Sequence, residues 1–203
     1  MKHDQLWQTA WADSLGGKDL TNARTGGRAS KANPNKEDQT WWQDQGPRWV
    51  AEYISWREAN PDWKIWITPD GVPAVELVLA PTIANGTVVK MVIDRIFEVQ
   101  GSLVVVDLKT SSRDPSSALQ LGFYKWGVEQ KYPGMKVAWG TYFMSRKAGV
   151  LPLEDLSFYT DEKMEYLING FDVARKTKIY IPNPSSCNLC GFTKICQFTT
   201  KGK

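Results

Sequence analysis

Apolar residues in the middle of the chain crowd into short runs rich in valine and isoleucine, the texture of buried or half-buried strands. Such runs predict strands over 75–80, 88–99 and 103–108. Asn85-Gly86 separates the first two runs and Gln100-Gly101 separates the second and third, and pairs of this kind are typical of tight hairpin turns. We therefore expect a three-stranded antiparallel meander.

On either side of this meander, apolar residues recur at helical spacing. Trp49, Tyr53 and Trp56 show this spacing in a helix expected from about Pro47 to Glu58. Asp114-Pro115 resembles an N-cap followed by proline at the first helical position, which predicts that a helix begins there. Helices are thus expected over 3–14, 47–58, 116–130 and 161–176, and further strands over 136–144 and 156–159.

The order of these elements predicts an α/β sheet covered by helices. With 203 residues, 42% hydrophobic and 12% aromatic, the chain can build one domain with a real core, and wholesale disorder is excluded. We expect a helical part over 1–70, a core over 73–178 and a tail over 179–203. No apolar run approaches the roughly 18 residues of a membrane span and no charged segment precedes an apolar one, so a membrane span and a secretory signal are both disfavoured.

The net charge of +3 hides two basic stretches. One lies in an expected loop over 15–39, and the other is the last 29 residues, with six Lys and Arg and no acid. Each alone is typical of a solvated loop or a frayed tail, and together they could flank a groove that follows phosphates. The candidate DNA contacts in the loop are Arg24, Arg28, Lys31 and Lys36. Eight of ten tryptophans lie in the first 66 residues. By default we expect them to pack in the core, and the alternative is that they are platforms on which bases stack.

Two acids face each other in the expected meander. If Gln100-Gly101 is a two-residue turn, the numbers of paired residues add up to 201, and Asp94 falls opposite Asp107. Like charges at directly opposed positions are destabilising, and burying an unpaired charge is costly. A bridging divalent cation would remove the repulsion, and hard oxygen ligands suit Mg²⁺ or Mn²⁺.

Three further polar residues extend this pair. Lys109 shares the strand face of Asp107, where an ammonium group can orient water and stabilise a pentavalent phosphate. Gln120 and Tyr124 stand four residues apart and share a helix face. A solvated charge cluster on a hairpin and an ordinary helix surface remain the alternatives, and a register slip of one residue would separate the acids.

The motifs resemble a known nuclease family. The segments Ile93-Asp94-Arg95, Val106-Asp107-Leu108-Lys109-Thr110 and Gln120-Leu121-Gly122-Phe123-Tyr124 resemble the D…(D/E)xK…QxxxY series of the PD-(D/E)XK nucleases in their RecB-like branch. The tail residues Cys187, Cys190 and Cys196 resemble the C-x2-C-x5-C end of its iron–sulfur members, which include exonucleases of CRISPR adaptation modules and their phage relatives. The resemblance covers roughly residues 73–198 and implies a restriction-endonuclease-like core, a mixed sheet flanked by helices, followed by a cysteine cluster segment.

The resemblance also implies a set of metal ligands. Asp94 and Asp107 would be the acidic ligands, and the Leu108 carbonyl would add a third oxygen. His3 matches a histidine that family members carry on an N-terminal helix, although a terminal histidine is more often simply exposed. Glu76 in the first strand is a weaker candidate for the same site.

The activity implied is that of a metal-dependent DNA exonuclease, phage-encoded and cytoplasmic in a bacterial host. Lys109 would position the attacking water, and Gln120 and Tyr124 would be the helix pair near the site. Single-stranded or frayed ends are the favoured substrate. The rival is a catalytically silent module that binds DNA ends or docks partner proteins in recombination or CRISPR adaptation, and neither hypothesis involves a membrane.

Three cysteines are a poor disulfide framework and point to a metal or cluster site. Iron–sulfur relatives take a fourth cysteine from upstream of the histidine helix, whereas this sequence begins at about the histidine. The three thiolates would hold a [4Fe–4S] cluster with a different fourth ligand, hold zinc, or mark a cluster-free relic. A redox-sensing iron–sulfur protein is a third hypothesis for the function.

Overall fold

The computed structural model describes residues 3–17, 39–179 and 195–196. The helices are α1 (His3–Leu15), α2 (Gln39–Ala59), α3 (Leu119–Lys131) and α4 (Asp161–Thr177), with a short 3-10 helix η1 (Ser145–Lys147). The strands are β1 (Lys64–Ile65), β2 (Val75–Leu79), β3 (Met91–Val99), β4 (Ser102–Lys109), β5 (Val137–Met144), β6 (Gly149–Val150) and β7 (Glu154–Asp155).

These strands form one mixed sheet. Its order is β1-β3-β4-β5-β6, with β2 also pairing with β3 and β7 with β5. β3 and β4 are antiparallel, whereas β4 and β5 are parallel because α3 crosses between them. The expected α/β architecture, a mixed central sheet flanked by helices, is confirmed.

The expected hairpin register between β3 and β4 is confirmed. Val99 pairs with Ser102 and Arg95 pairs with Val106, so the paired numbers add up to 201 along the ladder. Gln100 and Gly101 both have positive φ, at 50° and 78°, as a type I′ hairpin turn requires.

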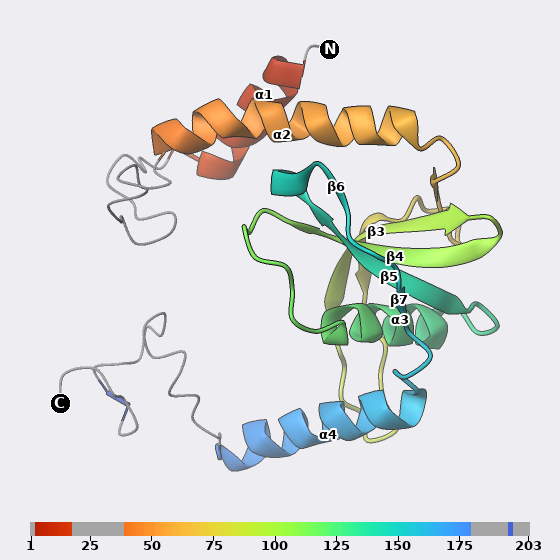
Figure 1. Cartoon of the computed structure of the whole chain (residues 1–203). Coiled ribbons are helices and arrows are strands. Elements are labelled where there is room, and N and C mark those ends of the chain that lie inside the picture. Colours follow the sequence, from red (N-terminus) through yellow and green to blue (C-terminus); the bar gives the residue numbers. More distant parts are fainter. Residues whose placement is uncertain (1–2, 18–38, 180–194, 197–203) are drawn as a thin grey trace.

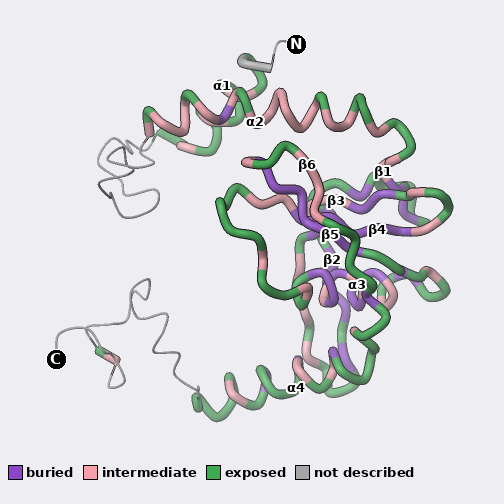
Figure 2. The backbone as a smooth tube through the Cα atoms, viewed as in Figure 1, coloured by how far each residue is buried: buried purple, intermediate pink, exposed green. Residues whose placement is uncertain are grey.

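Helices cover both faces of the sheet (Figure 1), and alternate residues of β4 point to opposite layers. Val104 and Val106 pack with Tyr53 and Trp56 of α2, whereas Val105 packs with Leu121 and others of α3. α4 lies beyond α3. Figure 2 shows the buried backbone concentrated in the central strands and α3. Among the described residues, no helix combines the length and apolar character needed to cross a bilayer.

Helix α2 is longer than expected. It begins at Gln39, and Pro47 lies inside it, so the prediction that a helix begins near Pro47 was wrong. Residues on both sides of the proline are tied together by ring contacts between Trp41, Trp42 and Trp49, whose centroids lie 5.2 to 5.5 Å apart. Aromatic packing of this kind outweighs the local cost of proline.

Two other predicted boundaries were also wrong. Asp114-Pro115 does not start α3, which begins at Leu119; the Asp114 carboxylate instead pairs with Lys147 Nζ at 2.7 Å. The strand expected over 156–159 is a turn, because the Asp155 carboxylate accepts the Ser157 N–H and Leu156 is buried in the core. The pairing with β5 falls just before it, in β7.

Close packing around α3 predicts that one added methyl group lowers the free energy of unfolding by a measurable amount. A Cβ at Gly122 would lie 2.4 Å from Tyr159 Cγ, so Gly122→Ala should lower the free energy of unfolding by about 1–3 kcal/mol despite the higher helix propensity of alanine. Gly170→Ala in α4 is the control, since nothing lies within 4 Å of its added Cβ and a gain of about 0.5–1 kcal/mol is expected. Urea unfolding measures both, and equal effects would contradict the packing argument.

Candidate functional site

The site is centred on a buried carboxylate. Leu103, Val105, Asp107 and Lys109 alternate along β4 on the face toward α3, and the first two belong to the core cluster there. Asp107 ends this apolar row with 2% of its surface exposed. A carboxylate in such a position requires donors or cations around it.

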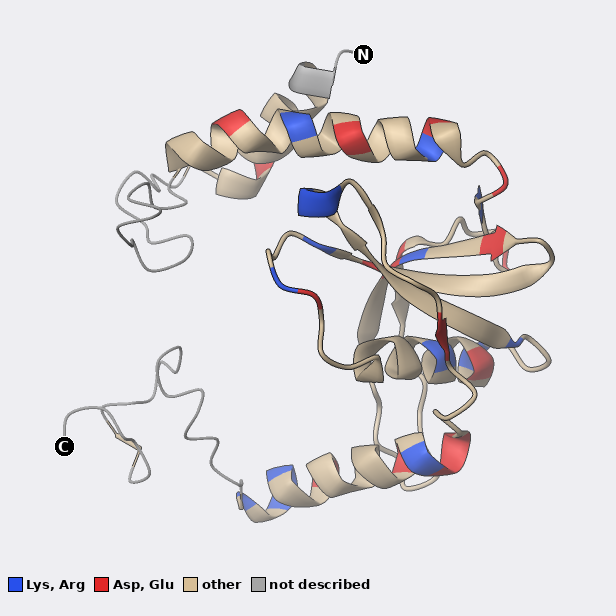
Figure 3. Cartoon of the chain, in the orientation of Figure 1, with Lys and Arg blue, Asp and Glu red and all other residues tan. Residues whose placement is uncertain are grey.

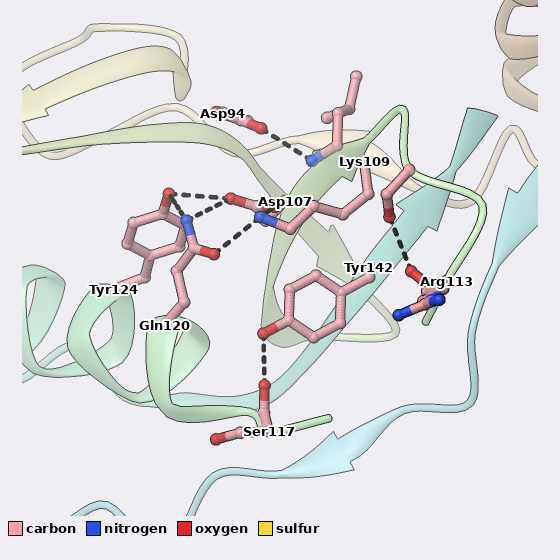
Figure 4. Close-up of polar contacts among 10 residues, drawn as sticks. Asp94, Asp107, Lys109, Arg113, Ser117, Gln120, Tyr124 and Tyr142 are labelled. Atoms are coloured by element: carbon pink, nitrogen blue, oxygen red, sulfur yellow. Dashed lines mark hydrogen bonds and ion pairs between the residues drawn. The ribbon is translucent and has the colours of Figure 1, made fainter. Parts of the chain in front are cut away.

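Two donors from α3 bind one oxygen of Asp107 (Figure 4). Gln120 Nε2 donates to Asp107 Oδ1 at 2.7 Å, and the Tyr124 hydroxyl donates to the same oxygen at 3.0 Å. Gln120 Nε2 also lies 2.9 Å from the Tyr124 oxygen, so Asp107, Gln120 and Tyr124 form one hydrogen-bonded network. Burial raises the pKa of Tyr124, and the negative charge of Asp107 raises it further, so the hydroxyl stays protonated and can donate.

Lys109 lies beside the other carboxylate oxygen of Asp107. Its Nζ lies 2.6 Å from Asp107 Oδ2 and donates to Gln120 Oε1 at 2.8 Å. The contact with Oδ2 lacks hydrogen-bond geometry, so Oδ2 is a buried oxygen with a charged neighbour and no hydrogen bond.

Asp94 stands at the point where β3 and β4 separate. The β3–β4 register, continued by one residue, puts Asp94 opposite Asp107, and Asp94 Oδ2 accepts the Leu108 N–H at 2.8 Å. Burial raises the pKa of Asp94 and outweighs the Leu108 hydrogen bond, which lowers it. The charges of Asp107 and Glu76 raise this pKa further.

Glu76 is near Asp94 but engaged elsewhere. Its carboxylate pairs with Arg95 Nη1 at 3.1 Å, and its side chain is 64% exposed. The same Arg95 nitrogen donates to the Asp94 carbonyl. Glu76 has a φ of 49°, an unusual backbone conformation for a residue with a side chain. Glu76 therefore contributes charge to the site through space while its carboxylate binds Arg95.

Sequence reasoning missed Tyr142 of β5. Its hydroxyl donates to the Ser117 carbonyl at 2.8 Å, just before α3, and its ring centroid lies 5.5 Å from Lys109 Nζ. Burial, together with nearby negative charge, raises the pKa of Tyr142 to about 12. Its only sequence signal was membership of an expected strand, because the parallel pairing of Asp107 with Tyr142 is set by a crossover that local patterns do not encode.

The residues present fit a hard divalent cation. No group of three or more His, Cys, Asp or Glu side chains gathers as a metal centre within the described ranges. Mg²⁺ usually takes one or two protein carboxylates and completes its shell with water and substrate phosphate. Asp94 and Asp107 provide such a pair, and Asp107 Oδ2 is an oxygen without a hydrogen bond.

Several predicted residues fall outside what the structure describes. Cys187, Cys190 and the basic residues Arg24, Arg28, Lys31 and Lys36 lie outside the described ranges, and the His3 side chain is likewise not described although His3 begins α1. Cys196 is described as a partly exposed free thiol. The structure thus brings together Asp94, Asp107, Lys109, Gln120 and Tyr124, with the Leu108 main chain beside Asp94.

Comparison with known proteins identifies the superfamily to which this chain belongs. The family model of the PD-(D/E)XK nuclease superfamily matches residues 3–197. The chain belongs to the PD-(D/E)XK nuclease superfamily, and this membership implies metal-dependent nuclease activity, generally with Mg²⁺ or Mn²⁺, and DNA binding. The mixed sheet and its flanking helices agree with a restriction-endonuclease-like core.

Two individual proteins are also similar to this chain. The chain is 29% identical over 191 residues to the Gene 69 protein of Mycobacterium phage D29, covering 84% of this chain and 69% of that protein. The crystal structure of SSO0001 is 17% identical with a TM-score of 0.46, over 78% of this chain and 73% of that one.

The electrostatics of Asp94 predict a stability gain on neutralisation. Since its folded-state pKa is raised, the contribution of Asp94 to stability falls as pH rises above about 3.8, the unfolded value. In EDTA, Asp94→Asn should therefore be more stable than wild type at pH 7, and this advantage should shrink toward pH 4. Denaturant unfolding across pH measures the difference.

Asp155 offers a control of opposite sign. Hydrogen bonds from Ser157 lower the pKa of Asp155, so its ionised form contributes stability above about pH 3.8 that is lost as pH falls through the lowered value. Asp155→Asn should be less stable than wild type at pH 7. If both variants shift in the same direction at pH 7, the electrostatic account of Asp94 is wrong.

Proposed function

We propose that the chain is a metal-dependent DNA exonuclease of the RecB-like, phage type. The observation that carries this proposal is the convergence of Asp94, Asp107 and Lys109 where the pairing of β3 with β4 ends, with Asp107 buried and oriented from α3. Superfamily membership and the phage relative support it.

Asp94 and Asp107 would hold the cation, with the Leu108 carbonyl as a further oxygen ligand. A bound Mg²⁺ or Mn²⁺ supplies Lewis acidity and makes water a stronger nucleophile at neutral pH. Asp94 is fixed by the Leu108 N–H, and Asp107 is fixed by Gln120 and Tyr124, so both carboxylates are oriented before substrate binds. His3 remains a proposed additional ligand.

Lys109 would orient the attacking water and stabilise the charge that develops on the phosphate. Its ammonium is held by Gln120 Oε1 and lies beside Asp107, on the wall of an open cavity. Gln120 therefore has two tasks, since its amide nitrogen positions Asp107 while its amide oxygen positions Lys109. The basic loop residues Arg24, Arg28, Lys31 and Lys36 would guide the strand, and single-stranded or frayed ends are the proposed substrate.

The activity is tested with labelled linear DNA in Mg²⁺, Mn²⁺ and EDTA. Asp107→Asn and Lys109→Ala should each lower the cleavage rate by about 100-fold or more, because each removes preorganised charge at the reacting phosphate. Lys64→Ala, an exposed lysine on β1, is the matched control and should cleave normally. Wild-type rates in Asp107→Asn or Lys109→Ala would refute the proposed site.

A second substrate separates exonuclease from endonuclease action. Circular single-stranded DNA should remain intact while the linear form is degraded, because an exonuclease needs an end. Cleavage of the circle would make the chain an endonuclease. A wild-type protein that binds DNA ends without cleaving them in any metal would support the rival function, a docking module for recombination or CRISPR-adaptation proteins.

We also propose that Cys187, Cys190 and Cys196 hold a metal, as a [4Fe–4S] cluster or a zinc ion. Three thiolates at this spacing are soft ligands of the kind that both groups prefer. Protein purified without oxygen should contain iron and sulfide, or zinc. Cys196→Ser should lose that metal while Asp94→Asn retains it. Wild-type protein free of iron and zinc would identify the cysteines as a relic.

A further inference from the structure

A cavity of about 620 Å³ opens beside the carboxylates. Lys109 and Tyr142 line it from the sheet, Leu119 and Phe123 line it from α3, and Arg113 lines it from the segment that joins β4 to α3. Clefts of about 300–1,000 Å³ are typical of sites for small-molecule-sized ligands. We call this cavity the side pocket.

The lining of the side pocket combines three kinds of chemical group and contains no carboxylates. Lys109 and Arg113 bring positive charge, three serine hydroxyls bring hydrogen-bonding groups, and Leu119, Phe123 and Tyr142 bring apolar and aromatic surface. No carboxylate belongs to its lining. Arg113 is exposed and forms no ion pair with the described residues, so its charge is available to a ligand. A ligand that fits has a flat apolar body and an anionic edge.

One wall of the side pocket is fixed in place from β5 and η1. Arg146 Nε donates to the Thr110 carbonyl at 2.7 Å, Lys147 Nζ pairs with Asp114 at 2.7 Å, and Tyr142 binds the Ser117 carbonyl at 2.8 Å. Segment 110–117 is therefore held at three points along its length. Figure 3 shows the Lys and Arg residues of η1 beside this segment. A wall fixed in this way lowers the ordering cost of binding.

We propose that the side pocket receives one unpaired nucleotide of the DNA strand, next to the phosphate at Asp94 and Asp107. The base would lie against Leu119 and Phe123, and its phosphate would face Arg113. Lys109 lines the pocket and also lies 2.6 Å from Asp107, so a strand with one nucleotide in the pocket places the adjoining phosphate near the carboxylates. This inference rests on the proposed nuclease function and adds a physical basis for its substrate.

The pocket would favour an unpaired strand. A base stacked in a duplex has no free face for Leu119 or Phe123, and taking it out of the stack costs a few kcal/mol. A nucleotide in a single strand or a frayed end avoids that cost, and its base gains apolar contact that does not depend on sequence. Duplex ends should therefore be bound and cleaved less well than single strands.

The test is a comparison between two variants and two DNA strands. Leu119→Ala removes apolar surface at a residue that is 36% exposed, so the variant should fold. Affinity is measured by fluorescence anisotropy with a short single strand in Ca²⁺, and with the same strand carrying one abasic nucleotide at successive positions. Wild type should discriminate against the abasic strand at one position by about 5- to 50-fold, and Leu119→Ala should lose most of that discrimination.

Arg113→Ala should weaken binding of both strands alike, by a similar factor and with a smaller salt dependence, because it removes a phosphate contact. Val173→Ala, an exposed valine on α4, and Lys64→Ala are the matched controls and should leave affinity unchanged.

The outcomes separate this inference from the nuclease proposal. Normal cleavage together with unchanged abasic discrimination in Leu119→Ala overturns the side pocket and leaves the nuclease intact. A wild type that shows no abasic discrimination at any position overturns it as well. Discrimination that Leu119→Ala abolishes, in a protein that cleaves nothing, supports the pocket and overturns the nuclease proposal.

Discussion

The burial of the Asp107 carboxylate constrains the whole site. Moving an ion into an apolar environment costs several kcal/mol unless donors and charges compensate it. Here the compensation comes from Gln120 and Tyr124 on one oxygen and from the Lys109 ammonium beside the other. These three partners come from two elements: Lys109 requires the strand alternation of β4, and Gln120 and Tyr124 require one turn of α3 at a fixed height above the sheet. The residues that would do the chemistry are thus also those that allow the acid to be buried.

The position of α3 is set by its close packing. Gly122 leaves room for the Tyr159 ring, and Gly127 leaves room for Met91, whose sulfur would lie 2.2 Å from an added Cβ. A larger residue at either position would displace the helix or its neighbour, and a hydrogen bond of 3.0 Å from Tyr124 to Asp107 tolerates little displacement. Apolar packing at Gly122 and Gly127 therefore helps to determine the positions of Gln120 and Tyr124.

Local patterns in the sequence predicted the part of the site that depends on local geometry. The Gln100-Gly101 turn fixes the β3–β4 register, and with it the approach of Asp94 to Asp107. The spacing of Gln120 and Tyr124 on a helix face was equally readable. Tyr142 was not, because its pairing with Asp107 depends on a parallel crossover. The boundaries at Pro47 and Asp114 were predicted wrongly because tryptophan packing and the Lys147 ion pair are tertiary contacts that local helix signals do not encode.

The tryptophan-rich N-terminal part supports the site from the far side of the sheet. Trp56 and Trp63 pack on Phe97 as core residues. Nearer the start of α2, the Arg146 guanidinium lies 5.0 Å from the Trp41 ring centroid and 5.2 Å from that of Trp49. Its Nε also donates to the carbonyl of Thr110, the residue after Lys109. A cation held between aromatic rings and a carbonyl resists displacement more than an exposed ion pair does, because part of its binding is not screened by salt. The tryptophans of α2 thereby act on the strand end that carries Lys109, through Arg146.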